Sequence, residues 1–381
     1  MLMVGINSGW TGPLIPEIAR ALSIPIERAG LMVSAGAAGG FISVLIAGEI
    51  HQQLSAQKIL VGAMALFTAG LAGLALAPGL AVLLCANFLN GLANGGIDVG
   101  ANAIIVELNR ERLASALNYL HVLFGVGALL GPLIVSAAFA GHVHYWWVFG
   151  GGSMACAAIA TGLSITPAVA VQTEPIVGSD SEDGSGFLQM LSRPVIWALS
   201  AVMFLYVGSE LGIGAWLFLY LRTAGALSPM LASSGVSVYW LGLVCGRGFG
   251  GRIGHRMAIP QFTMLAAALS ALAIVILIAA PTAVGLAPSA IFLIGFGYGP
   301  IFPNMIAAGA ARFPAEVGRM TSIVVAAGAL GGIVGPWLMG HAIAHTSPRA
   351  SMEVALAGTI AMSALALSLR GKPQGRPLEL D

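Results

Sequence analysis

Two acidic residues stand inside long apolar stretches, where an ionisable side chain is costly to place. Asp98 lies within the apolar run 81–107 and Glu210 within the run 195–221. No basic residue lies near the middle of any apolar run, so the sequence predicts that neither acid has a salt-bridge partner. Burial without a partner favours the protonated carboxyl, which could then take up and release a proton. Asp98 and Glu210 are therefore the candidate cation-coupling residues.

A stripe of amides accompanies Asp98. Positions i, i+3, i+7, i+11 and i+15 keep its members on one face of a helix, and they are Asn87, Asn90, Asn94, Asp98 and Asn102. Such a face predicts the lining of a polar pathway, with Asn94 and Asn102 contacting a solute. The alternative is a seam of interhelical hydrogen bonds that only fixes packing.

Further candidates for solute binding are a histidine within an apolar run and aromatic residues near Glu210 or near prolines. Tyrosine and tryptophan offer an apolar face with a polar edge, which suits the CH face and hydroxyls of a sugar ring. The run 295–304, GFGYGPIFPN, combines three glycines with two prolines and predicts a broken helix at a moving gate. Packing is the alternative role for each of these residues, which are His121, Tyr206, Trp216, Tyr298 and Asn304.

The composition requires a membrane. Of 381 residues, 58% are hydrophobic and 8% are charged, whereas a soluble domain carries roughly 25% charged residues. The mean hydropathy is +0.92. A net charge of +1 argues against a nucleic-acid partner. The sequence contains no phosphate-binding Walker motif, no HExxH and no metal-ligand spacing, so we expect neither an enzyme nor a bound cofactor or metal.

The apolar runs are too long for barrel strands and predict an all-α integral membrane protein with about twelve transmembrane helices. The spans are 2–22, 28–50, 58–77, 81–107, 115–139, 144–166, 195–221, 230–250, 260–281, 284–310, 320–343 and 350–369. They form two six-helix halves, 1–170 and 194–370, with a linker at 171–193 and a tail at 371–381. The halves echo each other in a glycine stripe that ends in Gly131-Pro132 and again in Gly335-Pro336, which suggests duplication.

The distribution of basic residues predicts the orientation, because cytoplasmic loops are enriched in lysine and arginine. One side of the predicted topology holds twelve of the sixteen bases: Lys58, Arg110, Arg112, Arg193, Arg247, Arg252, Arg256, Arg312, Arg319, Arg370, Lys372 and Arg376. We therefore expect both termini and the linker in the cytoplasm, in a bacterial-type plasma (inner) membrane. The first span begins almost at the first residue, and no signal peptide is recognisable before it.

The two-times-six layout resembles the major facilitator superfamily, which repeats a glycine- and arginine-rich loop motif in each half. The run 246–256, GRGFGGRIGHR, looks like the second copy, and the run 47–53, AGEIHQQ, is a degenerate first copy. The resemblance implies a major facilitator fold. It also implies that Arg247, Arg252 and Arg256 belong to a gating loop.

Within that superfamily the chain is similar to the fucose permease group of sugar:proton symporters and to sodium-coupled glucose carriers. The run 96–103, GIDVGANA, is similar to the group's helix-4 motif, which places Asp98 on its acidic position and Asn102 on the following asparagine. His121 falls on a cavity glutamine, and the helix-7 pattern includes Glu210 and Trp216. Gly12 stands where fucose permease has an acid, so the resemblance leaves coupling to Asp98 and Glu210.

Together these features predict a secondary transporter that works by alternating access on a sugar-like solute, with H⁺ or Na⁺ as the symported ion. The expected partners are the solute, the ion and the bilayer, and the expected state is a monomer. One alternative is a proton-coupled exporter of drugs or metabolites. Another, from a different class, is a non-transporting membrane receptor or scaffold on the same fold.

Overall fold

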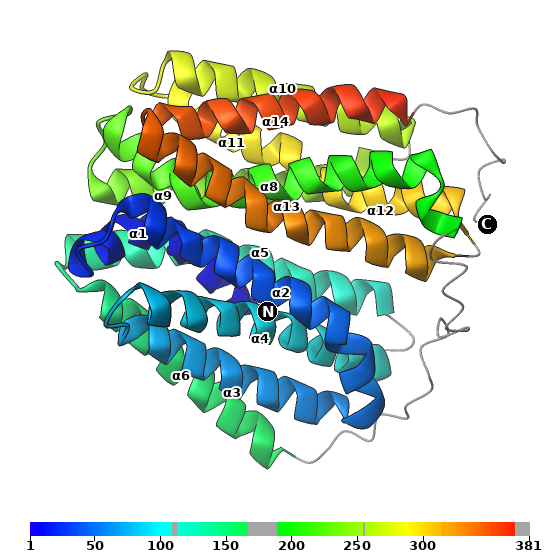
Figure 1. Cartoon of the computed structure of the whole chain (residues 1–381), viewed down its shortest axis with the longest axis horizontal. Helices are drawn as coiled ribbons and strands as arrows, with labels where there is room; N and C mark the ends of the chain where they lie inside the picture. The colour runs from blue at the N-terminus through cyan, green and yellow to red at the C-terminus, as the bar shows by residue number, and fades with distance from the viewer. Residues whose placement is uncertain (109–112, 167–188, 254–255, 315, 370–381) are drawn as a thin grey trace.

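The structure is a computed structural model, and it describes residues 1–108, 113–166, 189–253, 256–314 and 316–369. Of the predicted linker 171–193, only the last residues lie in this part of the chain, and the predicted tail 371–381 lies outside it. The described part is nearly all helical (Figure 1).

The helices of the first half match the first six predicted spans, with ends that differ by no more than three residues. They are α1 (Leu2–Ala21), α2 (Ile26–Gln53), α3 (Ala56–Ala75), α4 (Leu80–Leu108), α5 (Leu113–Ala140) and α6 (Tyr145–Ile165).

The second half follows the same plan with one span divided in two. Its helices are α8 (Pro194–Thr223), α9 (Pro229–Ile253), α10 (Ile259–Ala279), α11 (Leu286–Tyr298), α12 (Ile301–Arg312), α13 (Val317–His345) and α14 (Arg349–Ser368). The predicted break falls at Gly299-Pro300, between α11 and α12. Proline has no backbone N–H to continue the helical ladder, which explains why the break falls there.

Ten segments of the described residues are long and apolar enough to cross a membrane, with α11 and α12 counted as one segment. They do not include α1, which is long enough but more polar, or α2, of which the structure describes only part in full. On α1 the polar residues include Asn7, Ser8 and Thr11. Because α1 and α2 pack alongside the other spans, the twelve-helix membrane fold holds, and the polarity of α1 points to an interior role.

The two Gly-Pro repeats have the same packing role in each half. On α5, a Cβ at Gly127 or Gly131 would lie within 2.5 Å of a backbone oxygen of α1. On α13, a Cβ at Gly331 or Gly335 would lie within 2.3 Å of a backbone oxygen of α8. The glycines let the two helices of each pair approach closely, so the sequence echo reflects an equivalent helix crossing.

The two bundles lie side by side, the first in blue to green and the second in green to red (Figure 1). Hydrogen bonds join them: Ser34 Oγ donates to the Ile333 oxygen at 2.7 Å, and Ser237 Oγ donates to the Leu129 oxygen at 2.9 Å. Trp216 of α8 packs so tightly on α2 that a Cβ at Gly30 would overlap its ring. These contacts extend from the middle of the helices toward one end of the molecule. We call this end, where α1 connects to α2 and α8 to α9, the closed end.

Candidate functional site: a cavity between the two halves

A cavity of about 230 Å³ lies between the two halves near the middle of the helices. Three helices of the first half (α1, α2 and α4) and two of the second (α8 and α9) form its walls. The lining residues are Asn7, Ser8, Thr11, Gly12, Val33, Gly36, Ala37, Gly40, Asn87, Gly91, Asn94, Leu211, Gly214, Ala215 and Trp240. A midplane site at the interface of two repeats is where transporters bind their solutes.

The wall of this cavity combines polar side chains with glycine and apolar residues, and none of the described lining residues is charged. Three of its buried polar atoms have no hydrogen-bond partner among those residues: Asn87 Oδ1, Asn94 Oδ1 and Trp240 Nε1. Two of them are acceptors and one is a donor. Because an unsatisfied buried polar group costs about 1–3 kcal/mol, these atoms are suited to hydrogen-bond a guest.

Close helix packing positions the amides. A Cβ at Gly91 would lie 1.8 Å from the Gly36 oxygen, so only glycine lets α4 approach α2 at this height. Asn87, one turn earlier on α4, donates through Nδ2 to the Met32 oxygen of α2. That bond holds the Asn87 amide in place, while its Oδ1 is buried without a hydrogen-bond partner among the described residues.

The amide stripe divides between different surroundings. Asn87 and Asn94 line the cavity. Asn90 packs against Gly70 of α3 and is only 1% exposed. Asn102 donates to Asp98 within α4.

Asp98 lies one turn beyond Asn94 on α4, on the side of the cavity away from the closed end. The expectation that it is buried without a partner is wrong: Asp98 is exposed, and Asn102 Nδ2 donates to its Oδ1 at 2.9 Å. Depth along a helix does not reveal exposure, because a residue in mid-span can still face the space between two bundles.

Glu210 has a cationic partner, contrary to the expectation from sequence. Arg247 Nη2 lies 3.4 Å from Glu210 Oε1 and donates also to the Tyr206 hydroxyl at 3.5 Å. The Glu210 side chain is 11% exposed and that of Arg247 is 39% exposed. Arg247 lies inside α9, within the predicted span 230–250, and not in the loop to which the family resemblance assigned it. Neither residue lines the cavity, although Arg247 lies two turns from Trp240 on α9 and Glu210 precedes Leu211 on α8.

The aromatic candidates do not line the cavity: Tyr206 and Tyr298 lie inside the second half, and Trp216 packs against α2 at the boundary between the halves. Tyr206, Trp216 and Tyr298 are at most 1% exposed. The Trp216 indole donates to the Pro336 oxygen at 2.9 Å, and the Tyr298 hydroxyl lies 2.6 Å from Thr359 Oγ1. Asn304 of α12 donates to Thr263 of α10 at 3.3 Å.

The remaining predicted residues lie at the opposite end from the closed end. Arg252 is exposed in the last turn of α9, and Arg256 is exposed just before α10. His121 belongs to α5, but its side chain lies outside the described part. The two exposed arginines are thus separated from Arg247, which turns toward Glu210.

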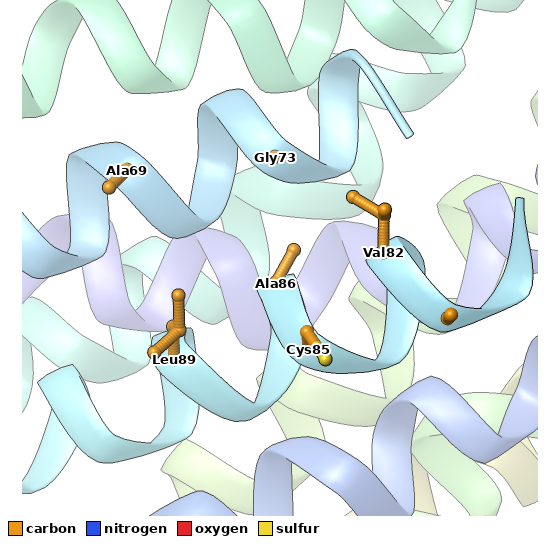
Figure 2. Close-up of a pocket in the computed structure, with 7 residues that line it drawn as sticks. Ala69, Gly73, Val82, Cys85, Ala86 and Leu89 are labelled. Atoms are coloured by element: carbon orange, nitrogen blue, oxygen red, sulfur yellow. The ribbon is translucent and has the colours of Figure 1, made fainter. Parts of the chain in front are cut away.

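A second hollow, of about 260 Å³, lies between α3 and α4 of the first half (Figure 2). Its lining is apolar apart from a thiol: Ala69, Gly73, Ala81, Val82, Cys85, Ala86 and Leu89. With few polar groups to orient a solute, it is a weaker candidate than the cavity between the halves.

Trp240, Asn7 and Thr11 were not among the predicted site residues, although they line the cavity. For α1 a signal existed, because three polar residues within five positions are unusual in a membrane span. For Trp240 there was none, since aromatic residues are common in spans and only the fold reveals its unpaired indole.

Comparison with known proteins agrees with this architecture. The sequence profile described as Major Facilitator Superfamily matches residues 1–336. An uncharacterized MFS-type transporter of Yersinia pestis is 25% identical over 371 residues, covering 96% of this chain and 91% of that protein. A mutant form of the nucleoside transporter NupG superposes with a TM-score of 0.83 at 12% identity, covering 97% of both chains. FucP in the outward conformation gives 0.62 at 17% identity, covering 97% of this chain and 98% of that one.

Proposed function

The chain belongs to the Major Facilitator Superfamily and is a membrane transporter, and on that premise we propose that it carries a neutral, sugar-like solute by cation symport. The solute occupies the cavity between the halves. The proton is our first choice for the symported ion.

The observation that carries this proposal is the trio of unpaired atoms at an uncharged cavity. A hydroxyl both donates and accepts, so once the side chains turn toward a polyol it could pair with acceptors such as Asn87 Oδ1 and Asn94 Oδ1 and with the donor Trp240 Nε1. The Trp240 ring adds an apolar face for the CH groups of a sugar. An ionised solute would find no counter-charge among the described lining residues.

Coupling is assigned to Asp98 and Glu210, which lie on α4 and α8, helices from opposite halves that both line the cavity. Protonation of Glu210 would remove its charge and weaken the ion pair with Arg247. The released guanidinium would then lie beside the cavity on α9. Asp98 is open to proton exchange, because it is exposed on α4.

Alternating access follows from where the halves touch. With both termini in the cytoplasm of a bacterial-type cell, the closed end faces outward and the cavity communicates with the inside. Trp216 and Gly30 then belong to the outer gate, and the rocking of the halves around the cavity exposes the solute to each side in turn.

Uptake into proteoliposomes tests the solute assignment. We expect accumulation of at least one member of a panel of neutral sugars. Asn94→Ala and Trp240→Phe should each raise KM about threefold to tenfold, which corresponds to one hydrogen bond of about 1 kcal/mol. Matched controls are Asn304→Ala, whose amide faces α10, and Trp146→Phe at the exposed start of α6. Equal effects in the variants and the controls would refute the cavity assignment.

The coupling assignment has its own test. Asp98→Asn and Glu210→Gln should each abolish proton-driven accumulation of the solute. Transport of the solute down its own concentration gradient should continue. Assays with a proton uncoupler, and with and without Na⁺, separate the two ions. If both variants accumulate solute as the wild type does, the assignment is wrong.

The same assays address the two alternative functions. An exporter would give substrate-dependent resistance in cells, with no alkalinisation of the medium on adding solute. A receptor would bind a ligand that never crosses sealed vesicles. The amide side chains in the cavity wall favour a polar solute over the apolar drugs of an exporter.

A further inference from the structure

Two histidines lie one turn apart in the last two turns of α13, at the closed end. The rings of His341 and His345 have centroids 4.2 Å apart and an interplanar angle of 56°. Both residues are exposed. Histidines at i and i+4 on one helix face are the spacing from which proteins build bidentate transition-metal sites.

The neighbouring residues favour a bound cation. The indole of Trp337 stacks on the His341 ring at 5.7 Å and 24°, which restricts the orientation of that imidazole. The pair lies at the helix C-terminus, where the carbonyl ends of the helix favour positive charge. Arg349, the nearest basic residue along the chain, is occupied by an ion pair with Glu353 at 2.9 Å.

The position of the pair places it at the membrane boundary. Exposed apolar side chains, which are Leu330, Val334, Trp337 and Leu338, run along α13 toward the pair. The helix ends at His345, and a short turn leads to α14. Water and dissolved ions therefore have access to the two rings, whereas lipid covers the stripe before them.

From this geometry we infer that His341 and His345 form a divalent transition-metal site of the Cu²⁺, Ni²⁺ or Zn²⁺ class, completed by water. Imidazole nitrogen is a preferred ligand of these ions. The described residues hold no group of three or more histidine, cysteine, aspartate or glutamate side chains that could hold a metal, so we expect the site to be open and exchangeable. It does not depend on the proposed solute or on coupling.

Copper titration of the purified full chain, carried on a tag without histidine, tests the site. We expect one Cu²⁺ per chain with an electron paramagnetic resonance spectrum of two coordinating imidazole nitrogens. His341→Ala and His345→Ala should each weaken copper binding about tenfold or more. The spectrum of each variant should then show one coordinating imidazole nitrogen in place of two. The control is His144→Ala, an exposed histidine at the start of α6, which should bind as the wild type does.

Two results would overturn the inference. One is unchanged copper affinity in His341→Ala/His345→Ala. The other is a loss in His144→Ala as large as in the α13 variants, which would indicate general surface binding. All three histidines are exposed, so we expect each alanine variant to remain folded. Thermal melting of each variant checks that a change in copper binding does not arise from unfolding.

Discussion

Glu210 and Arg247 form an ion pair that joins α8 to α9. The carboxylate is nearly enclosed on α8, and the guanidinium reaches it from α9 while remaining partly open. Removing only the cation would leave a buried charge without a partner, which is more costly than removing both members.

We therefore predict that Arg247→Gln destabilises the protein by about 1–3 kcal/mol. This range is below the value for fully buried pairs, because Arg247 is 39% exposed. The double variant Glu210→Gln/Arg247→Gln should regain part of the loss. Thermal unfolding in detergent measures both, with Arg252→Gln on the exposed last turn of α9 as the control. A double variant less stable than Arg247→Gln would contradict an ion pair.

Sequence could locate some of these residues and not others. Helical period alone placed Asn94 with Asp98, because spacing along one helix is readable without knowing the fold. The partnership of Glu210 and Arg247 was missed because it joins residues 37 positions apart. Its recognition requires knowing which faces of α8 and α9 meet. Trp240 was missed for the same reason.

At the scale of helices, the crossing of α1 and α8 depends on Gly12. A Cβ there would lie 2.1 Å from the Gly214 oxygen, across the boundary between the halves. Inserting a methyl group into such a contact typically costs about 1–3 kcal/mol. Because the contact belongs to the closed end, that cost falls mainly on the conformation described here.

Gly12→Ala should accordingly shift the population toward conformations in which this end is open. Spin labels at Ala21→Cys and Met230→Cys, both exposed near the closed end, report the opening as a longer distance. Labelling requires the three native cysteines to be replaced. Gly62→Ala on α3, where a Cβ meets nothing within 4 Å, is the matched control. Unchanged distances in Gly12→Ala would show that the crossing tolerates the methyl group.

The division between α11 and α12 yields a second prediction for an element. Pro300→Ala restores a backbone N–H at the break and should favour one continuous helix. We expect equal or higher thermal stability together with transport reduced about tenfold, because the break serves movement. Pro288→Ala, at an exposed position in the first turn of α11, should change neither. Normal transport by a stable Pro300→Ala protein would contradict a gating role for the break between α11 and α12.

Helix boundaries were largely readable from sequence, because apolar length and Gly/Pro breaks act locally. The ends agree within three residues, and a break within the run 295–304 was predicted, which the structure places at Gly299-Pro300. The helix α9 ends at Ile253, three residues beyond the predicted span. Arg252 therefore belongs to the last helical turn. The family resemblance assigned this glycine- and arginine-rich run to a loop, so it did not predict that Arg247 and Arg252 are helical.

For the whole molecule, charged side chains of both halves lie on the side of the cavity away from the closed end, and the one in the second half is held in an ion pair with Glu210. Asp98 projects from α4 of the first half, and Arg247 belongs to α9 of the second. Both helices run from the closed end toward that side. A change in the charge of Glu210 would thus alter the field across the space that must close when the transporter changes conformation.

The direction of that change depends on which end of the bundle faces the cytoplasm, and cysteine labelling can decide it. Leu76 and Leu54 flank α3 and are 78% and 45% exposed. In a background without Cys85, Cys156 and Cys245, we expect a membrane-impermeant maleimide to label Leu76→Cys in intact cells, and to label Leu54→Cys only after permeabilisation. The reason is that the closed end, which includes the α3–α4 connection, lies opposite the side rich in lysine and arginine. The reverse pattern would place both termini outside, and the conformation described here would then open outward.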